Sequence, residues 1–297
     1  MEKLKFIDLF CGIGGFRVAM DEACIENDII PECVFSSDID KCCQDSYELN
    51  FGHRPAGDIT QVNLQSIPDH DILYGGFPCQ PFSIIEQMKG FDDTRGTLFF
   101  YNASIIIEKK PKAFILENVK QLVGRNSGGT LKVIIKTLQD LGYHVQYAVL
   151  NALDYGLPQK RERVLIVGHG ESIMFSYPSP IRPFKPLSEI LEKKIDKKHI
   201  ASDYIKEKRK ESHKSAYKLS IWHENKAGNI CSYPYSCALR AGASYNYLLV
   251  NGERRLTPRE MFRLQGFPDT YQIINNDIQA RKQAGNAVPV NLVKMAA

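Results

Sequence analysis

KFIDLFCGIGGF, residues 5–16, decides the fold because an apolar, strand-length run leads directly into a cluster of glycines. The glycines fall at a turn from strand to helix, where a backbone without side chains can approach a ligand closely. The next apolar run, residues 32–37, ends at Asp38, about twenty residues further on, where a carboxylate can accept hydrogen bonds from ribose hydroxyls. Together these features favour a cofactor that contains adenosine, and a tight turn followed by an ordinary helix N-terminus is the alternative. The glycines of the turn are Gly12, Gly14 and Gly15.

Short apolar runs alternate with helix-length amphipathic stretches over the first 170 residues. This alternation is typical of an α/β fold with a doubly wound, mostly parallel sheet. The expected strands are residues 5–10, 32–37, 71–76, 113–118, 145–150 and 163–168. The expected helices include residues 14–25, 41–50, 97–109 and 128–141.

The composition of the sequence changes after Gly170, and residues 178–186 contain four prolines. Proline clusters mark loops and linkers, so we place a domain change at residues 171–188. The sequence therefore predicts a catalytic and cofactor-binding domain at residues 1–185, completed by residues 263–297, and a smaller domain at residues 186–262.

The composition is that of an ordinary soluble enzyme, with 297 residues, 43% hydrophobic and 24% charged. Apolar runs are much shorter than the roughly 20 residues of a membrane-spanning helix, and the N-terminus lacks the layout of a secretory signal. The eight cysteines fall in no zinc-binding spacing. We therefore expect a cytoplasmic protein in a reducing compartment, with no metal and no membrane partner.

The net charge of +4 is unevenly distributed. Residues 182–226 contain 13 Lys and Arg against 7 Asp and Glu, which gives this stretch a charge of +6. A surface that contacts phosphates and a solvated charged helix near residues 195–214 are both consistent with this pattern.

The run at residues 71–76 leads into GGFPCQPFS, which sets Cys79 between two prolines just beyond the carboxyl end of a strand. Ligands of α/β enzymes bind at this edge of the sheet. Taken alone, a cysteine at this position is more often inert packing, and the chemical significance of Cys79 depends on the residues near it.

Two other strands bring charged groups to the same edge. Residues 113–118 end in Glu117 and Asn118, and QKRER leads into the run that begins at Arg163. Because side chains alternate along a strand, we expect Arg161 and Arg163 to project to the same side. A nucleophile, a carboxyl group and two guanidinium groups would then converge on one rim. Individually, these are also the residues of a helix cap and a solvated strand edge.

Nine features in one order carry a resemblance that covers nearly the whole chain except about residues 171–250. They are FxGxGG (10–15), the acid at Asp38, GDIT (57–60), GFPCQPFS (76–83), GFDDTRGTLFF (90–100), ENV (117–119), QKRER (159–163), RRLTPREMFRLQGFPD (254–269) and QAGNAVPV (283–290). This series resembles the bacterial DNA (cytosine-5)-methyltransferases of restriction-modification systems. The resemblance implies the Rossmann-like fold of class I S-adenosylmethionine-dependent methyltransferases.

The resemblance assigns catalytic roles to four residues. Cys79 would be the nucleophile, because carbon 5 of cytosine is unreactive until a thiolate has added to C6. Glu117 would hold N3 and the exocyclic amine, and donation to N3 requires a protonated carboxyl group. Arg163 would contact the cytosine carbonyl oxygen and Arg161 would organise the site, while both positive charges assist ionisation of the thiol.

S-adenosylmethionine is the implied cofactor and S-adenosylhomocysteine the product. Asp38 would bind the ribose hydroxyls, and Asp58 and Ile59 the adenine. Ile39 stands where relatives can have an aromatic ring, so we expect weaker packing on the adenine. The implied cofactor-binding residues are Phe10, Gly12, Gly14, Gly15, Asp38, Ile39, Asp58, Ile59, Pro78, Leu98 and Asn286.

Double-stranded DNA is the implied substrate, and its target base must be flipped out of the stack before Cys79 can reach it. A loop at about residues 83–97 would close over the DNA. It has Ile85 and Glu86 where relatives often have a small residue and glycine, so we expect slower closure. The implied DNA-binding residues are Gln80, Ser83, Ile85, Glu86, Arg95 and Arg240.

Residues 186–262 would then be a target recognition domain. Arginine suits guanine and asparagine suits adenine in the major groove, so the polar residues near Arg240 are candidate base contacts, among them His223, Asn225, Lys226 and Asn229. The aromatic residues of this region fit a small hydrophobic core equally well: Trp222, Tyr233, Tyr235 and Tyr245.

We expect a monomer that shares its site with a cognate restriction endonuclease without forming a stable complex. Relatives often continue beyond the last motif through a longer helix, so a chain that ends at Ala297 is expected to be less stable if that helix is cut short.

Three other functions fit parts of the sequence. An inactive DNA-binding protein of the same fold is disfavoured because Cys79, Glu117 and both arginines are present. A tRNA methyltransferase is disfavoured by PFS instead of PFT after the nucleophile and by the sizeable recognition region. A nicotinamide dehydrogenase would explain the glycine turn but leave the PCQ and ENV segments without a role.

Overall fold

The computed structural model describes residues 2–78, 98–171, 173–181 and 183–296. It divides into two compact units, and each is described by itself. The first unit comprises Met1–Leu150, Glu162–Ser179 and Val293–Ala297, and the second comprises Asn151–Arg161 and Pro180–Leu292.

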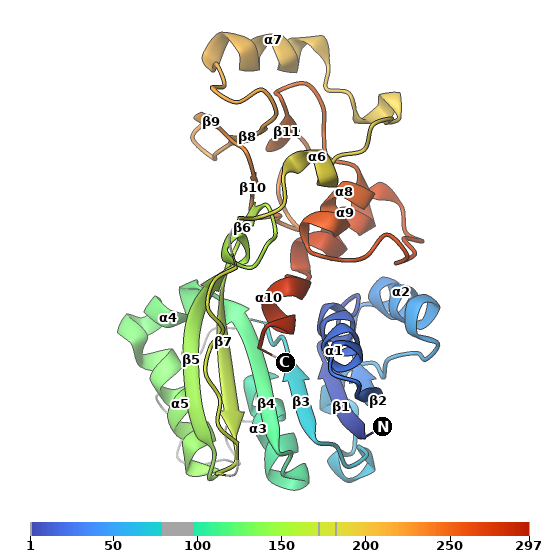
Figure 1. Cartoon of the computed structure of the whole chain (residues 1–297), viewed down its shortest axis with the longest axis vertical. Helices are drawn as coiled ribbons and strands as arrows, with labels where there is room; N and C mark the ends of the chain where they lie inside the picture. Colours follow the sequence, from blue (N-terminus) through green and yellow to red (C-terminus); the bar gives the residue numbers. More distant parts are fainter. Residues whose placement is uncertain (1, 79–97, 172, 182, 297) are drawn as a thin grey trace. The chain divides into compact units, whose positions relative to one another are not determined.

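A six-stranded sheet forms the first unit, in the order β2-β1-β3-β4-β7-β5 (Figure 1). β1 pairs in parallel with β2 and β3, β3 pairs in parallel with β4, and β7 runs antiparallel to β4. All six predicted strands are confirmed, with ends that differ by two residues at most. The strands are β1 (Lys3–Leu9), β2 (Ile30–Ser37), β3 (Ile72–Gly75), β4 (Ala113–Val119), β5 (His144–Asn151) and β7 (Glu162–His169).

Helices cover both faces of this sheet, as the alternation of side chains along β3 shows. Leu73 packs in a core cluster with side chains of α3 and α5, among them Phe99 and Leu131. The next residue, Tyr74, points to the other face, where its hydroxyl donates to Met20 Sδ of α1. The expected doubly wound α/β fold is thus confirmed. The helices are α1 (Gly15–Glu26), α2 (Lys41–Phe51), α3 (Leu98–Lys109), α4 (Gln121–Gly124) and α5 (Gly129–Asp140), with short 3-10 turns at Ile59–Gln61, Leu64–Ser66 and Arg125–Gly128.

The second unit has its own small sheet and helices. Its sheet is antiparallel, in the order β11-β8-β9, and β10 pairs in parallel with β6. The strands are β6 (Gln159–Lys160), β8 (Ile221–Glu224), β9 (Ile230–Tyr233), β10 (Ser236–Cys237) and β11 (Leu248–Val250). The helices are α6 (Leu187–Ile190), α7 (Asp203–Ser212), α8 (Pro258–Leu264) and α9 (Asp277–Asn286), with 3-10 turns at Ala152–Asp154 and Lys197–His199. A final helix, α10 (Val290–Lys294), runs through the chain boundary between the two units.

Residues 263–292 were expected to complete the catalytic domain, but the structure places them in the second unit. Arginine side chains of this segment bond to residues 180–262. Arg263 Nη1 donates to Ile190 O at 3.0 Å, and Arg281 donates to the carbonyl oxygens of Ala243 and Ser244 at 3.3 and 3.2 Å. Gln159 Nε2 also donates to Leu264 O at 2.8 Å, which attaches residues 151–161 to the same unit.

The aromatic residues of the second unit divide between core and surface. Trp222 is 6% exposed, and a Cβ on Gly252 would lie 2.8 Å from its ring. Tyr245 is 44% exposed. The tryptophan therefore belongs to the core of this unit, whereas Tyr245 lies on its surface.

The basic run at residues 182–226 is partly neutralised by ion pairs. Arg209 of α7 is buried and lies 2.7 Å from Glu224, and Lys210 lies 2.9 Å from Glu253. Part of the positive charge therefore stabilises the second unit. Among the described residues, no helix is long and apolar enough to span a membrane.

Candidate active site

The functional segments predicted for the first unit meet at one edge of its sheet. The carboxyl ends of β1, β2, β3 and β4 lie at this edge because these strands are parallel. β7 is antiparallel, so its beginning lies there too, and Arg163 pairs in register with Val119. The chain passes from β1 to β2 on one side and returns to β3 on the other side of β1. Such a switch in strand order is where α/β proteins bind ligands.

The turn after β1 holds its backbone in the left-handed region at Phe10, Gly12 and Gly14, with φ of 55°, 53° and 81°. A residue with a bulky side chain, such as Phe10, seldom has a backbone in this region, and it does so only where surrounding contacts require it. The N–H of Gly12 donates to Asp38 Oδ2 at 2.8 Å, and the N–H of Asp40 donates to Oδ1 at 2.8 Å. The turn therefore fixes the orientation of the predicted ribose-binding carboxylate.

The glycines of this turn have different roles. A Cβ on Gly14 would lie 2.3 Å from the ring of Phe51, so this glycine allows close packing on α2. A Cβ on Gly12 would meet no heavy atom within 4 Å among the described residues. Open space therefore adjoins Gly12, beside Asp38, and Gly15 begins α1.

The residues predicted to contact adenine differ in what they expose. Ile39, next to Asp38, is 73% exposed. Asp58 caps a 3-10 turn by accepting from Thr60 N at 2.9 Å. The side chain of Ile59 is buried in the core, so only its backbone is available to a ligand. Of the remaining two residues, Pro78 is exposed and Leu98 is half-buried.

These residues fit a cofactor that contains adenosine. Gly12 leaves open space for close approach, and Asp38 is a carboxylate held in a fixed orientation. The exposed side chain of Ile39 adds an apolar surface of the kind on which a purine ring packs.

A buried acid behind the glycine turn escaped the sequence analysis. Asp8 of β1 is fully buried, and neither of its carboxylate oxygens has a hydrogen-bond partner among the described residues. Burial raises the pKa of Asp8 well above its ordinary value, although the positive charge of Arg17 opposes this shift. Burial likewise raises the pKa of the Cys11 thiol in the turn. No sequence pattern distinguishes Asp8 from an ordinary acid near a strand end.

Glu117 and Arg163 form the ion pair on which the site is built. Arg163 Nε lies 2.7 Å from Glu117 Oε1, and the two side chains are 13% and 11% exposed. Antiparallel pairing of β4 and β7 sets Glu117 opposite Leu165 and Val119 opposite Arg163, so the paired charges are diagonal neighbours. Charges removed from water persist when they are paired. The structure therefore brings together two of the four predicted catalytic residues.

Asn118 supports the chain that leads to Cys79. Its side-chain nitrogen donates to Phe77 O at 2.8 Å, and its oxygen accepts from Val119 N at 2.9 Å. Phe77 lies two residues before Cys79 and is 2% exposed. The sequence analysis gave Asn118 no role, although its position next to Glu117 in the ENV motif was a signal.

The expectation that Arg161 and Arg163 project to the same side does not hold. β7 begins at Glu162, so Arg161 precedes the strand whose alternation was assumed. Its guanidinium is buried in the second unit, where it donates to the carbonyl oxygens of Leu239, Gly285 and Ala287 at 2.8, 2.9 and 2.9 Å. Three carbonyl acceptors satisfy a buried guanidinium better than a rim shared with Arg163 would.

Two other predicted residues, Arg240 and Asn286, are exposed in the second unit. The predicted nucleophile and most predicted DNA contacts lie outside the described residues: Cys79, Gln80, Ser83, Ile85, Glu86 and Arg95.

Comparison with known proteins agrees with the motifs. The C-5 cytosine-specific DNA methylase family matches residues 4–297. Type II methyltransferase M.NgoBI of Neisseria gonorrhoeae is 53% identical over 98% of this chain and 90% of its own length. M.HaeII of Haemophilus aegyptius is 52% identical over 100% of this chain and 92% of its own length. M.HhaI of Haemophilus parahaemolyticus is 41% identical over 99% of this chain and 93% of its own length.

Solved structures share the fold at lower identity. A mutant of DNMT2 from Spodoptera frugiperda has a TM-score of 0.77 and 19% identity, over 98% of this chain and 97% of that one. A prophage-encoded putative DNA modification methyltransferase of E. coli has a TM-score of 0.72 and 21% identity, over 99% and 97%. Family, relatives and fold agree, and the chain belongs to the C-5 cytosine-specific DNA methylase family.

Proposed function

We propose that this chain transfers a methyl group from S-adenosylmethionine to C5 of a cytosine within a short, specific sequence of double-stranded DNA. The observation that carries the proposal is the Glu117–Arg163 ion pair, at the same sheet edge as the oriented carboxylate of Asp38. Membership of a DNA methylase family and relatives that are type II methyltransferases support it.

Bound S-adenosylmethionine supplies a methyl group on a sulfonium centre and leaves as S-adenosylhomocysteine. Asp38 would accept hydrogen bonds from the ribose hydroxyls, the turn at Gly12 would allow close approach of the cofactor, and Ile39 would pack against the adenine. The other residues that we propose for this site are Phe10, Gly14, Gly15, Asp58, the backbone of Ile59, Pro78, Leu98 and Asn286.

Cys79 acts as the nucleophile. Its thiolate forms a bond to C6 of cytosine, and the electron pair of the C5–C6 double bond moves towards C5 and N3. C5 then takes the methyl group. Loss of the C5 proton returns an electron pair to the ring, the C5–C6 double bond re-forms, and the carbon–sulfur bond breaks to release the Cys79 thiolate.

Glu117 and Arg163 hold the base during these steps. The O–H of the protonated Glu117 carboxyl group donates to N3 and its other oxygen accepts from the exocyclic amine, so the proton balances negative charge that develops on the ring. Arg163 has several N–H donors and already contacts Glu117, which leaves others for the carbonyl oxygen of cytosine. Asn118 positions the segment before Cys79 through its bond to Phe77 O.

The remaining parts of the proposal concern DNA. The target cytosine is flipped out of the duplex, and residues 186–262 read the flanking sequence, with Arg240 as a base contact. Residues near the nucleophile contact the DNA around the flipped base: Gln80, Ser83, Ile85, Glu86 and Arg95. The protein acts as a monomer on bacterial chromosomal DNA in the cytoplasm, and it protects sites that a separate restriction endonuclease cuts.

Sequencing of 5-methylcytosine in DNA from cells that express this chain tests the proposal. We expect one short methylated sequence with the wild-type chain and none with Cys79→Ala, while the variant still binds S-adenosylmethionine. Methylation by Cys79→Ala would remove Cys79 as the nucleophile. No methylated DNA from a wild-type chain that binds the cofactor would contradict the DNA substrate and favour an RNA substrate.

A further inference from the structure

Residues 239–247, here called the clamped loop, connect β10 to β11 in the second unit and carry Arg240. Both ends of this loop are fixed by buried groups. Leu239 N donates to Gln159 Oε1 at 2.9 Å, and Leu239 O accepts from Arg161 Nη1 at 2.8 Å. Arg240 N donates to the hydroxyl of Tyr247 at 2.9 Å, which closes the loop on itself.

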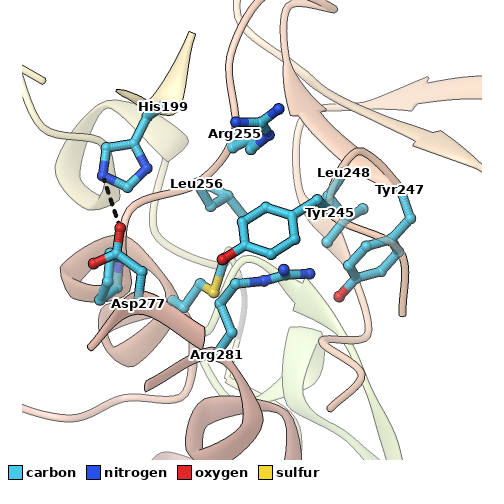
Figure 2. A pocket seen from close by; sticks show the side chains of 10 residues that line it. His199, Tyr245, Tyr247, Leu248, Arg255, Leu256, Asp277 and Arg281 are labelled. Atoms are coloured by element: carbon cyan, nitrogen blue, oxygen red, sulfur yellow. Dashed lines mark ion pairs between the residues drawn. The ribbon is translucent and has the colours of Figure 1, made fainter. Parts of the chain in front are cut away.

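Arginine side chains hold the middle of the clamped loop. Arg281 of α9 donates to the carbonyl oxygens of Ala243 and Ser244 at 3.3 and 3.2 Å. Its guanidinium lies 3.9 Å from the centroid of the Tyr245 ring, and that of Arg255 lies 5.4 Å from the same centroid. Figure 2 shows the ring between these two arginines.

The clamp extends to the last residues of the loop. Arg255 Nε donates to Asn246 Oδ1 at 2.9 Å, and Arg209 donates to the carbonyl oxygen of Asn246. At the other end, a Cβ on Gly285 would lie 2.3 Å from Ala241 N, so the backbone of α9 directly supports the loop. Exposed loops are usually mobile, but this one is restrained along most of its length.

Arg240 differs from the arginines of the clamp. It is exposed, and its guanidinium lies 4.8 Å from the centroid of the buried Tyr247 ring. Among the described residues, no hydrogen bond uses a guanidinium N–H of Arg240, whereas Arg281 donates to two carbonyls of the loop and Arg255 donates to Asn246 and to Lys198 O. The clamped loop contains no acidic residue. A rigid support thus presents one arginine with its donors available, as recognition of a guanine edge requires.

We propose that Arg281 positions the clamped loop so that Arg240 can read a base edge in the major groove, and that Arg281 thereby sets sequence discrimination. This inference rests on the proposed function. Arg281 lies two residues before the terminal motif QAGNAVPV, which the resemblance connects with the cofactor through Asn286. Its contacts connect it instead with the loop that carries Arg240. Arg281 is therefore a positioning residue, with no part in methyl transfer.

The test compares methylation rates on the recognised sequence and on all its single-base variants, in one DNA library. For Arg281→Ala, we expect the ratio of the rate on the recognised site to the rate at mismatches of one base pair to fall about tenfold, the discrimination of one arginine–guanine contact. Lys282→Ala removes the same charge from the exposed neighbouring position and should leave the ratio unchanged.

Tyr245 supplies a second, milder pair of variants. Tyr245→Phe keeps the ring between Arg255 and Arg281 and should keep the discrimination ratio, whereas Tyr245→Leu removes the ring and should lower it. These variants decide the question if Arg281→Ala does not fold. Thermal unfolding of each variant separates loss of discrimination from loss of stability.

The outcomes distinguish this inference from the function on which it rests. If the wild-type chain methylates no DNA, both fall. If it methylates DNA but Arg281→Ala and Tyr245→Leu keep its discrimination, only the inference is overturned. An equal fall in rate on every sequence, with weaker dependence on salt, would identify Arg281 as a phosphate contact and would also overturn it.

Discussion

The sheet edge of the first unit and the clamped loop of the second unit position their functional side chains by different means. At the sheet edge, the register of β4 and β7 sets Glu117 beside Arg163, and one amide from Asn118 fixes the chain before Cys79. In the clamped loop, guanidinium groups from distant parts of the sequence hold backbone carbonyls. We infer that strand register positions the catalytic residues. Long-range side-chain hydrogen bonds position the residues that recognise the DNA sequence.

The largest effect is expected at Glu117. Glu117→Gln keeps the shape of the side chain but cannot supply a proton to N3, so the rate of methyl transfer should fall by about 10² to 10⁴. Single-turnover methylation with bound DNA measures this step directly. Glu162→Gln is the matched control, since Glu162 lies on the neighbouring strand β7 and pairs with Lys120 on the surface. A Glu117→Gln rate within threefold of wild type would contradict the assigned role.

Arg161 and Arg163 allow a test with the same residue type on both sides of the comparison. Arg161→Met removes a donor from the carbonyls of Leu239, Gly285 and Ala287, of which Ala287 keeps only a bond of 3.3 Å from Gln265, so the free energy of unfolding should fall by about 3 kcal/mol. Arg163→Lys should lower the rate of methyl transfer with little change in stability. Chemical denaturation and single-turnover rates separate the two, and Lys160→Met, at an exposed position, is the control.

The opposite result would restore the prediction from the sequence. If Arg161→Met lost methyl transfer at unchanged stability, Arg161 would be a catalytic residue after all.

Asp8 gives a pH-dependent prediction for the first unit. Burial raises the pKa of Asp8 in the folded protein above the unfolded value of about 3.9. The folded state therefore loses stability as pH rises from the unfolded pKa to the folded pKa. Asp8→Asn does not titrate. The stability of the variant relative to wild type should therefore increase with pH from about 4 upward, as measured by thermal unfolding. A difference that stays constant with pH would show that Asp8 titrates alike in both states.

The smallest effect is expected at Ile39. An aromatic ring in place of this exposed side chain offers a larger surface to the adenine, so Ile39→Trp should lower the Kd for S-adenosylmethionine about threefold. Isothermal titration calorimetry measures this change. Ile25→Trp introduces the same ring at a site 68% exposed on α1 and should leave the Kd unchanged. Equal effects at both positions would argue against adenine packing on Ile39.

The sequence predicted most of the first unit because its signals are local. Apolar runs marked each strand, and glycines marked the turn that orients Asp38. The predicted partnership of Glu117 and Arg163 required only that two strand ends meet at one edge, and the structure confirms that they do.

The destination of Arg161 could not be predicted in this way. Its acceptors lie 78, 124 and 126 residues further along the chain, and no local pattern carries that information. The same holds for Arg281 and the clamped loop, and for residues 263–292, which Arg263 attaches to the second unit through the carbonyl of Ile190. Isolation of Asp8 from hydrogen-bond partners likewise depends on what packs around it.

The central claim is that different residues set the rate of methyl transfer and the discrimination between DNA sequences. The most direct test measures the methylation rates of Glu117→Gln and Arg281→Ala on all single-base variants of the recognised site. The account predicts that Glu117→Gln lowers every rate by the same factor and leaves the ranking of sites intact. It predicts that Arg281→Ala lowers the rate on the recognised site about tenfold relative to sites that differ at the base pair read by Arg240. A reordered profile for Glu117→Gln, or a uniform fall for Arg281→Ala, would contradict it.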